Sequence, residues 1–397
     1  MKKKLLIVTA TAMLGLVACG AGNQDVIPSG GEKVENDVAV KKLGAAVTKT
    51  TTGKGLSVEA KSFALRAKVE MNTPSIDINT DIPNFSDFLA GSTATAQAGV
   101  KWETMSVNAE IKNVTFKAAV AGLDGRSSND LKASLNFAET HSFNVNGAGS
   151  SIDSSATLKA NAYVANTTAY LDLSDEATFN ALKDLGMPLP FEAAGKYGVK
   201  GEAQTFDGPV GESMISSVPM VGQFLDEDYL EQLVSQSEGM VSAVKYSDTR
   251  FGVKAEMGLD KILPMMTAGA MGGMAEIGGG AAAIDMSMLD ENDKFDLRAG
   301  MVFDTEKGLE SIAFTLNAKL DVTAKEIFGA ESGLDAKDLE KKVYSVDASA
   351  DIRFEFKVGE VTVNLPANFN DYEVSKTQAD DGREEEGGEI NYSDLLA

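Results

Sequence analysis

Cysteine, histidine and tryptophan are almost absent from this chain, since each occurs once in 397 residues. The single cysteine, Cys19, excludes an intramolecular disulfide. With one cysteine and one histidine, His141, the sequence gives no support to a Ser-His-Asp or a Cys-His catalytic arrangement. His141 lies in a strand-like run, and the acidic cluster at 290–296 is typical of a polar turn, so a metal site has little support as well. We therefore expect a protein that is not an enzyme and has no metal or other cofactor.

Basic residues are scarce. Lysine and arginine together number 36 against 59 acidic residues, which gives a net charge of −23. A surface of this sign repels phosphate backbones, and no basic cluster interrupts it from residue 19 onward, so we expect no nucleic-acid partner. Anionic lipid headgroups are repelled for the same reason, which suits a domain held away from a membrane surface.

Long apolar runs are missing too, because none approaches the roughly eighteen residues that a membrane-spanning helix requires. One short apolar run, residues 5–16, follows three lysines at the start of the chain and precedes the small residue Ala18. A basic segment, a short apolar segment and small residues before a cleavage site are typical of a secretory signal peptide. The sequence therefore predicts a signal peptide over residues 1–18.

The cysteine that follows this segment makes the prediction more specific. Leu16-Val17-Ala18-Cys19 resembles the lipobox of a bacterial lipoprotein signal, and the alternative is an ordinary secretion signal with a chance cysteine. The resemblance implies transfer of a diacylglyceryl group to the Cys19 thiol, followed by cleavage before that residue. Each buried CH₂ contributes about 0.8 kcal/mol to membrane binding, and the diacylglyceryl group carries two acyl chains. Fatty acids such as palmitate would therefore anchor the protein in the cell membrane, and the signal peptide implies that it lies on the extracytoplasmic side.

The two ends of the mature chain differ from its middle in composition. Residues 19–42 are rich in Gly, Asn, Ser, Lys and Glu, which is typical of a flexible tether. Residues 374–397 carry a strongly acidic stretch at 380–389 and are expected to form a disordered tail. Between them we expect one antiparallel β-rich domain over residues 43–373, with two domains divided near residue 210 as the alternative.

A period of two dominates this middle part. Between Tyr344 and Val358, every second residue is apolar and the residues between them are polar. Such alternation is typical of a strand with one dry and one wet face. The same pattern predicts strands at 63–71, 105–111, 131–137, 158–164, 251–257, 295–303, 312–322 and 344–358. Near Lys112-Asn113 the phase of the alternation slips, which predicts a β-bulge.

Long one-sided strands joined by polar turns favour an antiparallel meander. We expect a mainly β (α+β) fold of about nine long strands, forming a curved sheet or half-barrel with a few amphipathic helices on its concave face. Helical periodicity predicts these helices at 175–185, with Ser174 as N-cap, and at 223–244. Thr323 to Glu326 is a capping box that opens a short helix, and a second short helix is expected near 335–342.

Two features suggest a hydrophobic ligand. The segment 264–289 combines glycines and alanines with six of the sixteen methionines, a residue that recurs on surfaces that adapt to apolar partners. It could cover a cavity as a mobile apolar lid, serve as an exposed connector or dip into a membrane. Many expected inward positions are alanine, which lets helices pack closely or leaves room for a ligand. The candidate ligand-binding residues are Met265, Met266, Met271, Met274, Leu225, Tyr229 and Leu233.

The lipobox, the polar tether, the one-sided strands and the inserted helices together resemble the LolA/LppX-type lipoprotein carriers, over about residues 43–372. This resemblance implies a curved antiparallel half-barrel with helices at its mouth that binds acyl chains or lipidated cargo. The sequence thus predicts a membrane-anchored, non-catalytic binder or carrier of a lipid or acyl chain. The alternative is a structural or adhesive surface lipoprotein with a packed interior, and a carboxylate-based hydrolase is the weakest of the three.

Overall fold

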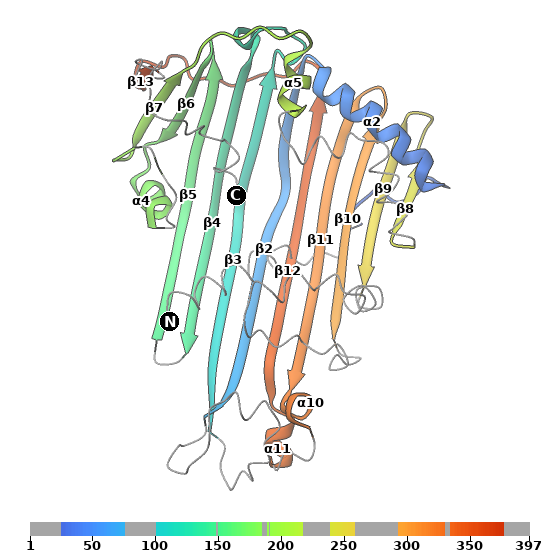
Figure 1. Cartoon of the computed structure of the whole chain (residues 1–397), viewed down its shortest axis with the longest axis vertical. Helices are drawn as coiled ribbons and strands as arrows, with labels where there is room; N and C mark the ends of the chain where they lie inside the picture. Colours follow the sequence, from blue (N-terminus) through green and yellow to red (C-terminus); the bar gives the residue numbers. More distant parts are fainter. Residues whose placement is uncertain are drawn as a thin grey trace, which may run out of the picture.

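One large open sheet dominates the computed structural model (Figure 1). The structure describes residues 25–75, 101–147, 150–184, 189, 191–216, 239–258, 293–329 and 334–376. In this part of the chain, thirteen strands follow one another in the order β1-β8-β9-β10-β11-β12-β2-β3-β4-β5-β6-β7-β13. All neighbours are antiparallel except β13, which runs parallel to β7. The predicted mainly β antiparallel sheet is therefore confirmed, although it has more strands than the nine expected.

The sheet consists of two meanders that meet in its centre, where β2 pairs with β12. The first meander comprises β2 (Gly55–Ser75), β3 (Lys101–Ala121), β4 (Lys132–Gly147), β5 (Ser150–Ala165), β6 (Thr168–Leu173) and β7 (Gly195–Lys200). The second comprises β8 (Val241–Lys245), β9 (Arg250–Gly258), β10 (Lys294–Asp304), β11 (Gly308–Thr323) and β12 (Lys342–Val358). The two outermost strands are short, namely β1 (Glu32–Val34) and β13 (Glu373–Lys376).

The predicted alternation fixes which residues share a face. In β12, Ala348 lies opposite Ala67 of β2 and Ala318 of β11, so these three alanines lie on one side of the sheet. The predicted bulge is confirmed, because the pairing of β3 with β4 shifts between Lys112 and Thr115. Asn113 adopts a φ of 55° there, and the shift keeps apolar side chains on one face on both sides of the bulge.

The tether predicted for residues 19–42 is wrong from Asp25 onward. Residues 25–30 lie on the polar face, where the Arg353 guanidinium donates to the Asp25 carbonyl oxygen at 2.7 Å. The chain then adds β1 to the edge of β8 and crosses to the apolar face as helix α2 (Asn36–Thr52). Most of its residues are small or polar, but four apolar residues at helical spacing lie on one face of the helix. These residues, Ala39, Val40, Leu43 and Ala46, pack on Phe251 and Phe303. The N-terminal part therefore wraps around one edge of the sheet.

The remaining helices are short and lie at the margins of the sheet (Figure 1). Helix α4 (Glu176–Asp184) lies beside β5, and its N-cap is Asp175 instead of Ser174, because the Asp175 carboxylate accepts the Thr178 N–H at 2.9 Å. The predicted capping box is confirmed: Thr323 and Glu326 cap α10 (Ala324–Phe328) reciprocally. Helix α11 (Ala336–Leu339) follows, and both lie at the far end of β11 and β12.

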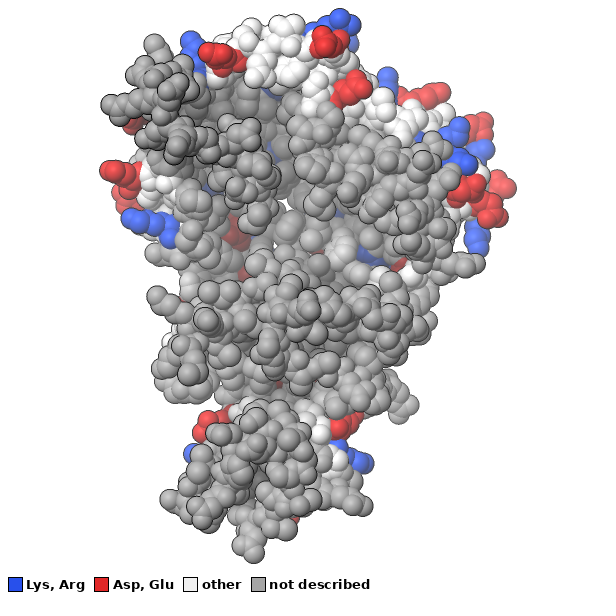
Figure 2. All heavy atoms as spheres, in the orientation of Figure 1, with Lys and Arg blue, Asp and Glu red and all other residues white. Residues whose placement is uncertain are grey.

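Helix α5 (Val210–Ser216) lies against the C-terminal end of α2. A Cβ on Gly211 would lie 1.9 Å from the Thr51 carbonyl oxygen, so only glycine allows this close approach. In the space-filling view, acidic and basic side chains are interspersed over the end of the molecule where α2 lies (Figure 2). Within the described residues no helix is both long and apolar enough to cross a membrane.

Candidate functional site

The apolar face of the sheet is the candidate site. Directly opposed small residues cross its centre from β11 to β3 in the order Ala318, Ala348, Ala67 and Ala109. Larger apolar side chains pack around this row, among them Leu65, Leu316 and Val346, which are buried. Burial on this face also raises the pKa of the Tyr344 hydroxyl. The strand alternation thus places a broad dry surface on one side of the sheet.

Three phenylalanines lie on the apolar face at the point where the strands change register. The Phe354 ring meets Phe116 edge-to-face with centroids 5.6 Å apart, and it meets Phe63 in the same way at 6.2 Å. The pairing shifts in β3 at Lys112–Thr115 and in β12 between Arg353 and Phe354. Because both shifts lie at the same level, rings from three strands come together there.

One titratable pair interrupts this dry surface. Glu139 and His141 both project to the apolar face, because they lie opposite Leu158 and Ile111 respectively. The His141 Nδ1 atom lies 2.7 Å from the Glu139 Oε1 atom. Glu139 is only 6% exposed, and its second oxygen, Oε2, is buried with no hydrogen-bond partner among the residues that the structure describes. A buried carboxylate with a free oxygen is costly, so this pair marks a polar point on an apolar surface.

A cavity of about 650 Å³ opens beside His141, between β5 and α4. Its lining includes Ser154, Ala156 and Lys159 from β5 and Asn180 from the helix. Helix α4 closes part of the free edge of β5, since the Thr178 hydroxyl accepts the Lys159 backbone N–H at 2.8 Å and donates to Asp175 at 2.7 Å. The cavity can hold a small molecule by volume, and its lining is of mixed polarity.

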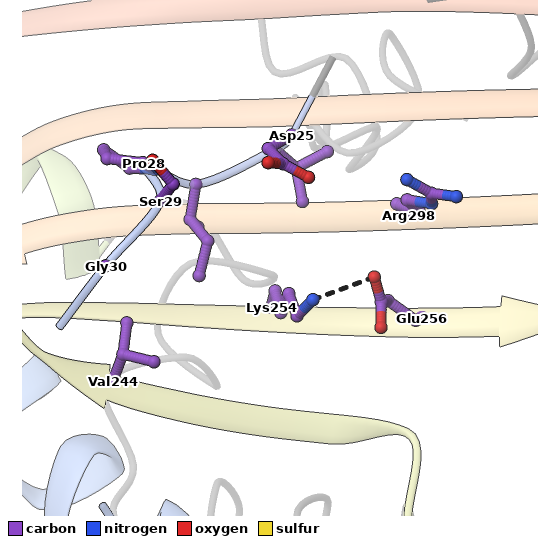
Figure 3. A pocket seen from close by; sticks show the side chains of 10 residues that line it. Asp25, Pro28, Ser29, Gly30, Val244, Lys254, Glu256 and Arg298 are labelled. Atoms are coloured by element: carbon purple, nitrogen blue, oxygen red, sulfur yellow. Dashed lines mark hydrogen bonds and ion pairs between the residues drawn. The ribbon is translucent and has the colours of Figure 1, made fainter. Parts of the chain in front are cut away.

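A smaller cavity of about 170 Å³ lies on the polar face, under residues 25–30 (Figure 3). Lys254 and Glu256 of β9 form an ion pair at 3.0 Å along its floor, and Arg298 of β10 lies beside them. Val26 lies on Gly300, where a Cβ would clash with the Val26 backbone at 2.7 Å. This volume is below the usual range for ligand sites, so we interpret the feature as the seat of the N-terminal segment.

All of the residues predicted to form the site lie outside the described residues. These are Cys19, Leu225, Tyr229, Leu233, Met265, Met266, Met271 and Met274. The helix predicted over 223–244 is wrong at its end, because Val241 and Val244 belong to strand β8. The disordered tail predicted over residues 374–397 is wrong for residues 374–376, which pair with β7 as part of β13, and the rest of that segment lies outside the described residues.

The sequence pattern predicts His141 to be a packed or surface histidine and does not predict its contact with Glu139. The two residues are separated by two positions in a strand, which was a usable signal that they share a face. Among the described residues, no group of three or more His, Cys, Asp and Glu side chains could hold a metal ion. Comparisons of this chain with protein families, with curated proteins and with solved structures found no match.

Proposed function

We propose that this protein is a non-catalytic binder or carrier of a hydrophobic ligand, a lipid or an acyl chain, that rests on the apolar face of the sheet. One observation carries the proposal: the alanine row from Ala318 to Ala109 crosses four neighbouring strands on a face that is otherwise apolar. Ala318 and Ala348 are buried, but the small side chains of Ala67 and Ala109 are only half-buried and leave room for a ligand, and apolar surface favours a ligand that water excludes.

The alternative, a structural or adhesive protein with a filled interior, is favoured by the part of the face beneath α2. There Phe303 and Ala243 are fully buried by the protein's own side chains. A ligand must therefore lie over the first meander and the centre of the sheet, where Ala67, Ala109 and Ala160 are only half-buried.

Native mass spectrometry of the protein lacking residues 1–19 tests the proposal. We expect co-purified lipid on the parent and its loss in Ala160→Trp and Ala109→Trp, which fill the volume above the sheet. Ala350 is unsuitable, because it is fully buried and tryptophan would overpack it. The matched control is Asp347→Trp, an exposed position on the polar face of β12. A lipid-free parent would favour the structural alternative.

We also propose that the protein is anchored through a lipid on Cys19, on the extracytoplasmic side of the cell membrane. The Cys19→Ala variant is expected to accumulate as an uncleaved precursor that does not incorporate a fatty-acid analogue. Processing and labelling equal to those of the parent would contradict the anchor, and this outcome is independent of ligand binding.

A further inference from the structure

The polar face of the first meander carries a second candidate site. Residues 359–372, the C-terminal strap, cross this face on their way from β12 to β13. The strap is fixed at its start, where the Gly359 N–H donates to the Gly55 carbonyl at 2.9 Å. It is fixed at its end, where Phe369 stacks on Tyr170 with ring centroids 3.8 Å apart and Tyr372 meets Tyr170 at 5.3 Å. The strap is therefore held in one position before any ligand arrives.

Two cavities of about 440 and 410 Å³ lie along the strap, and Tyr163 and Asn364 line both of them. We call this combined space the strap groove. Its floor includes a row of directly opposed polar residues, one from each strand between β2 and β6: Glu59, Lys117, Asn136, Asn161 and Asp172. A second row runs beside it: Ser57, Ala119, Ser134, Tyr163 and Tyr170. The groove thus runs across the strands and presents polar groups at each step.

The charges in the groove neutralise one another. Glu59 accepts from Lys117 at 3.1 Å, and Asp172 lies 4.0 Å from Lys196. The lining contains three carboxylates and two lysines, which is nearly balanced in a chain of net charge −23. The groove therefore suits a ligand without net charge, and it gives no cluster of unpaired cations for a phosphate.

Neutral hydrogen-bonding groups remain open in the groove. Asn136 donates to the Asn161 side-chain oxygen at 2.6 Å, which leaves the Asn136 oxygen and the Asn161 amino group for a ligand. Within the described residues, no hydrogen bond reaches the Tyr163 hydroxyl or the Asn364 side chain. Burial and the nearby Asp172 raise the pKa of Tyr163, so its hydroxyl stays protonated and can donate. The Tyr163 ring adds an apolar surface between these polar groups.

We propose that the strap groove binds a neutral oligosaccharide. Amides, hydroxyls and an aromatic ring match a ligand whose rings have apolar C–H faces and hydroxyl edges. Neighbouring strands lie about 4.8 Å apart, so successive polar side chains of the row are spaced by about the length of one hexose unit. A peptide fits less well, because β3, β4 and β5 are paired on both sides beneath the groove and offer no free strand edge for β-augmentation.

Saturation-transfer NMR on the full chain in a sugar-free detergent tests this proposal. The probes are hexasaccharides of α- and β-linked glucose, N-acetylglucosamine, mannose and galactose, with a hexapeptide of glycine and serine as the comparison. We expect at least one saccharide to bind. Tyr163→Ala should weaken that binding about tenfold through loss of the ring contact. Asn364→Ala should weaken it about fivefold through loss of hydrogen bonds.

The controls separate groove binding from general damage to the fold. Tyr163→Phe keeps the ring and should lose less affinity than Tyr163→Ala. Tyr197→Phe and Asn144→Ala remove a hydroxyl and an amide from strands β7 and β4 outside the groove, and they should bind like the parent. Binding that survives both Tyr163→Ala and Asn364→Ala, a parent that binds none of the saccharides, or displacement of the saccharide by the peptide would each overturn the proposal. None of these outcomes depends on lipid binding at the opposite face.

Discussion

The Trp102 indole Nε1–H donates to the Asp338 carboxylate at 2.9 Å and so joins the start of β3 to helix α11, 236 residues later. The Lys341 ammonium lies over the same ring, 5.3 Å from its centroid. These contacts fasten α11, a helix of four residues that could not be stable alone, to the far end of the sheet.

Asp338→Ala should release α11 from Trp102. Because this is the only tryptophan in the chain, its fluorescence should shift to longer wavelength as the ring becomes more exposed. We expect a loss of about 1 kcal/mol in the free energy of unfolding. Asp335→Ala is the control, since that side chain makes no capping hydrogen bond. Equal spectra for the two variants would contradict the contact.

Thr178→Val should remove the hydrogen bond that helix α4 makes to the edge of β5. Thr178 is 1% exposed, and its hydroxyl is the partner of the Lys159 N–H. Valine leaves this donor unsatisfied, at a cost of about 1–3 kcal/mol in urea unfolding. Hydrogen exchange at the Lys159 amide should accelerate as well. Thr178→Ser keeps the hydroxyl and should restore slow exchange; if serine fails to do so, packing of the methyl group matters more than the hydrogen bond.

Replacing Glu139 and His141 together should have a different effect from replacing one of them. His141→Leu leaves the Glu139 carboxylate buried without its partner and should lower the free energy of unfolding by about 3 kcal/mol. The double variant with Glu139→Leu removes both groups and should be at least as stable as the parent, because leucine suits this face. Glu110→Leu, in an exposed ion pair with Lys112, is the control and should change stability little. A double variant less stable than the parent would contradict this account.

Acid should weaken the ion-pair group on the polar face. Hydrogen bonds from Lys61 and Lys117 lower the pKa of Glu59 from 4.5 to about 2. Because the folded-state pKa is the lower one, the stabilisation is present above pH 4.5 and is lost as the pH falls toward 2. The difference in unfolding free energy between the parent and Glu59→Gln should therefore be constant above pH 4.5 and vanish near pH 2. A difference that persists at pH 2 would show that Glu59 acts through packing.

The local pattern of the sequence determined much of the sheet. In the run 344–358, strict alternation was enough to place a long strand with one dry face, because strand geometry turns every second side chain to the same side. The slip at Lys112-Asn113 and the capping box at Thr323 were visible for the same reason: each depends only on residues a few positions apart.

Only the tertiary structure decided how distant segments meet. The pairing of β2 with β12, the wrapping of residues 25–52 around an edge and the groove beneath the C-terminal strap all join residues far apart in the chain. Composition made residues 25–42 look like a tether, although packing on Phe251 and Phe303 stabilises α2 in spite of its weak local signal. The alternation of single strands placed Tyr163 and Asn161 near one another, but only the register across five strands and the path of the strap brought Glu59, Asp172 and Asn364 to the same groove.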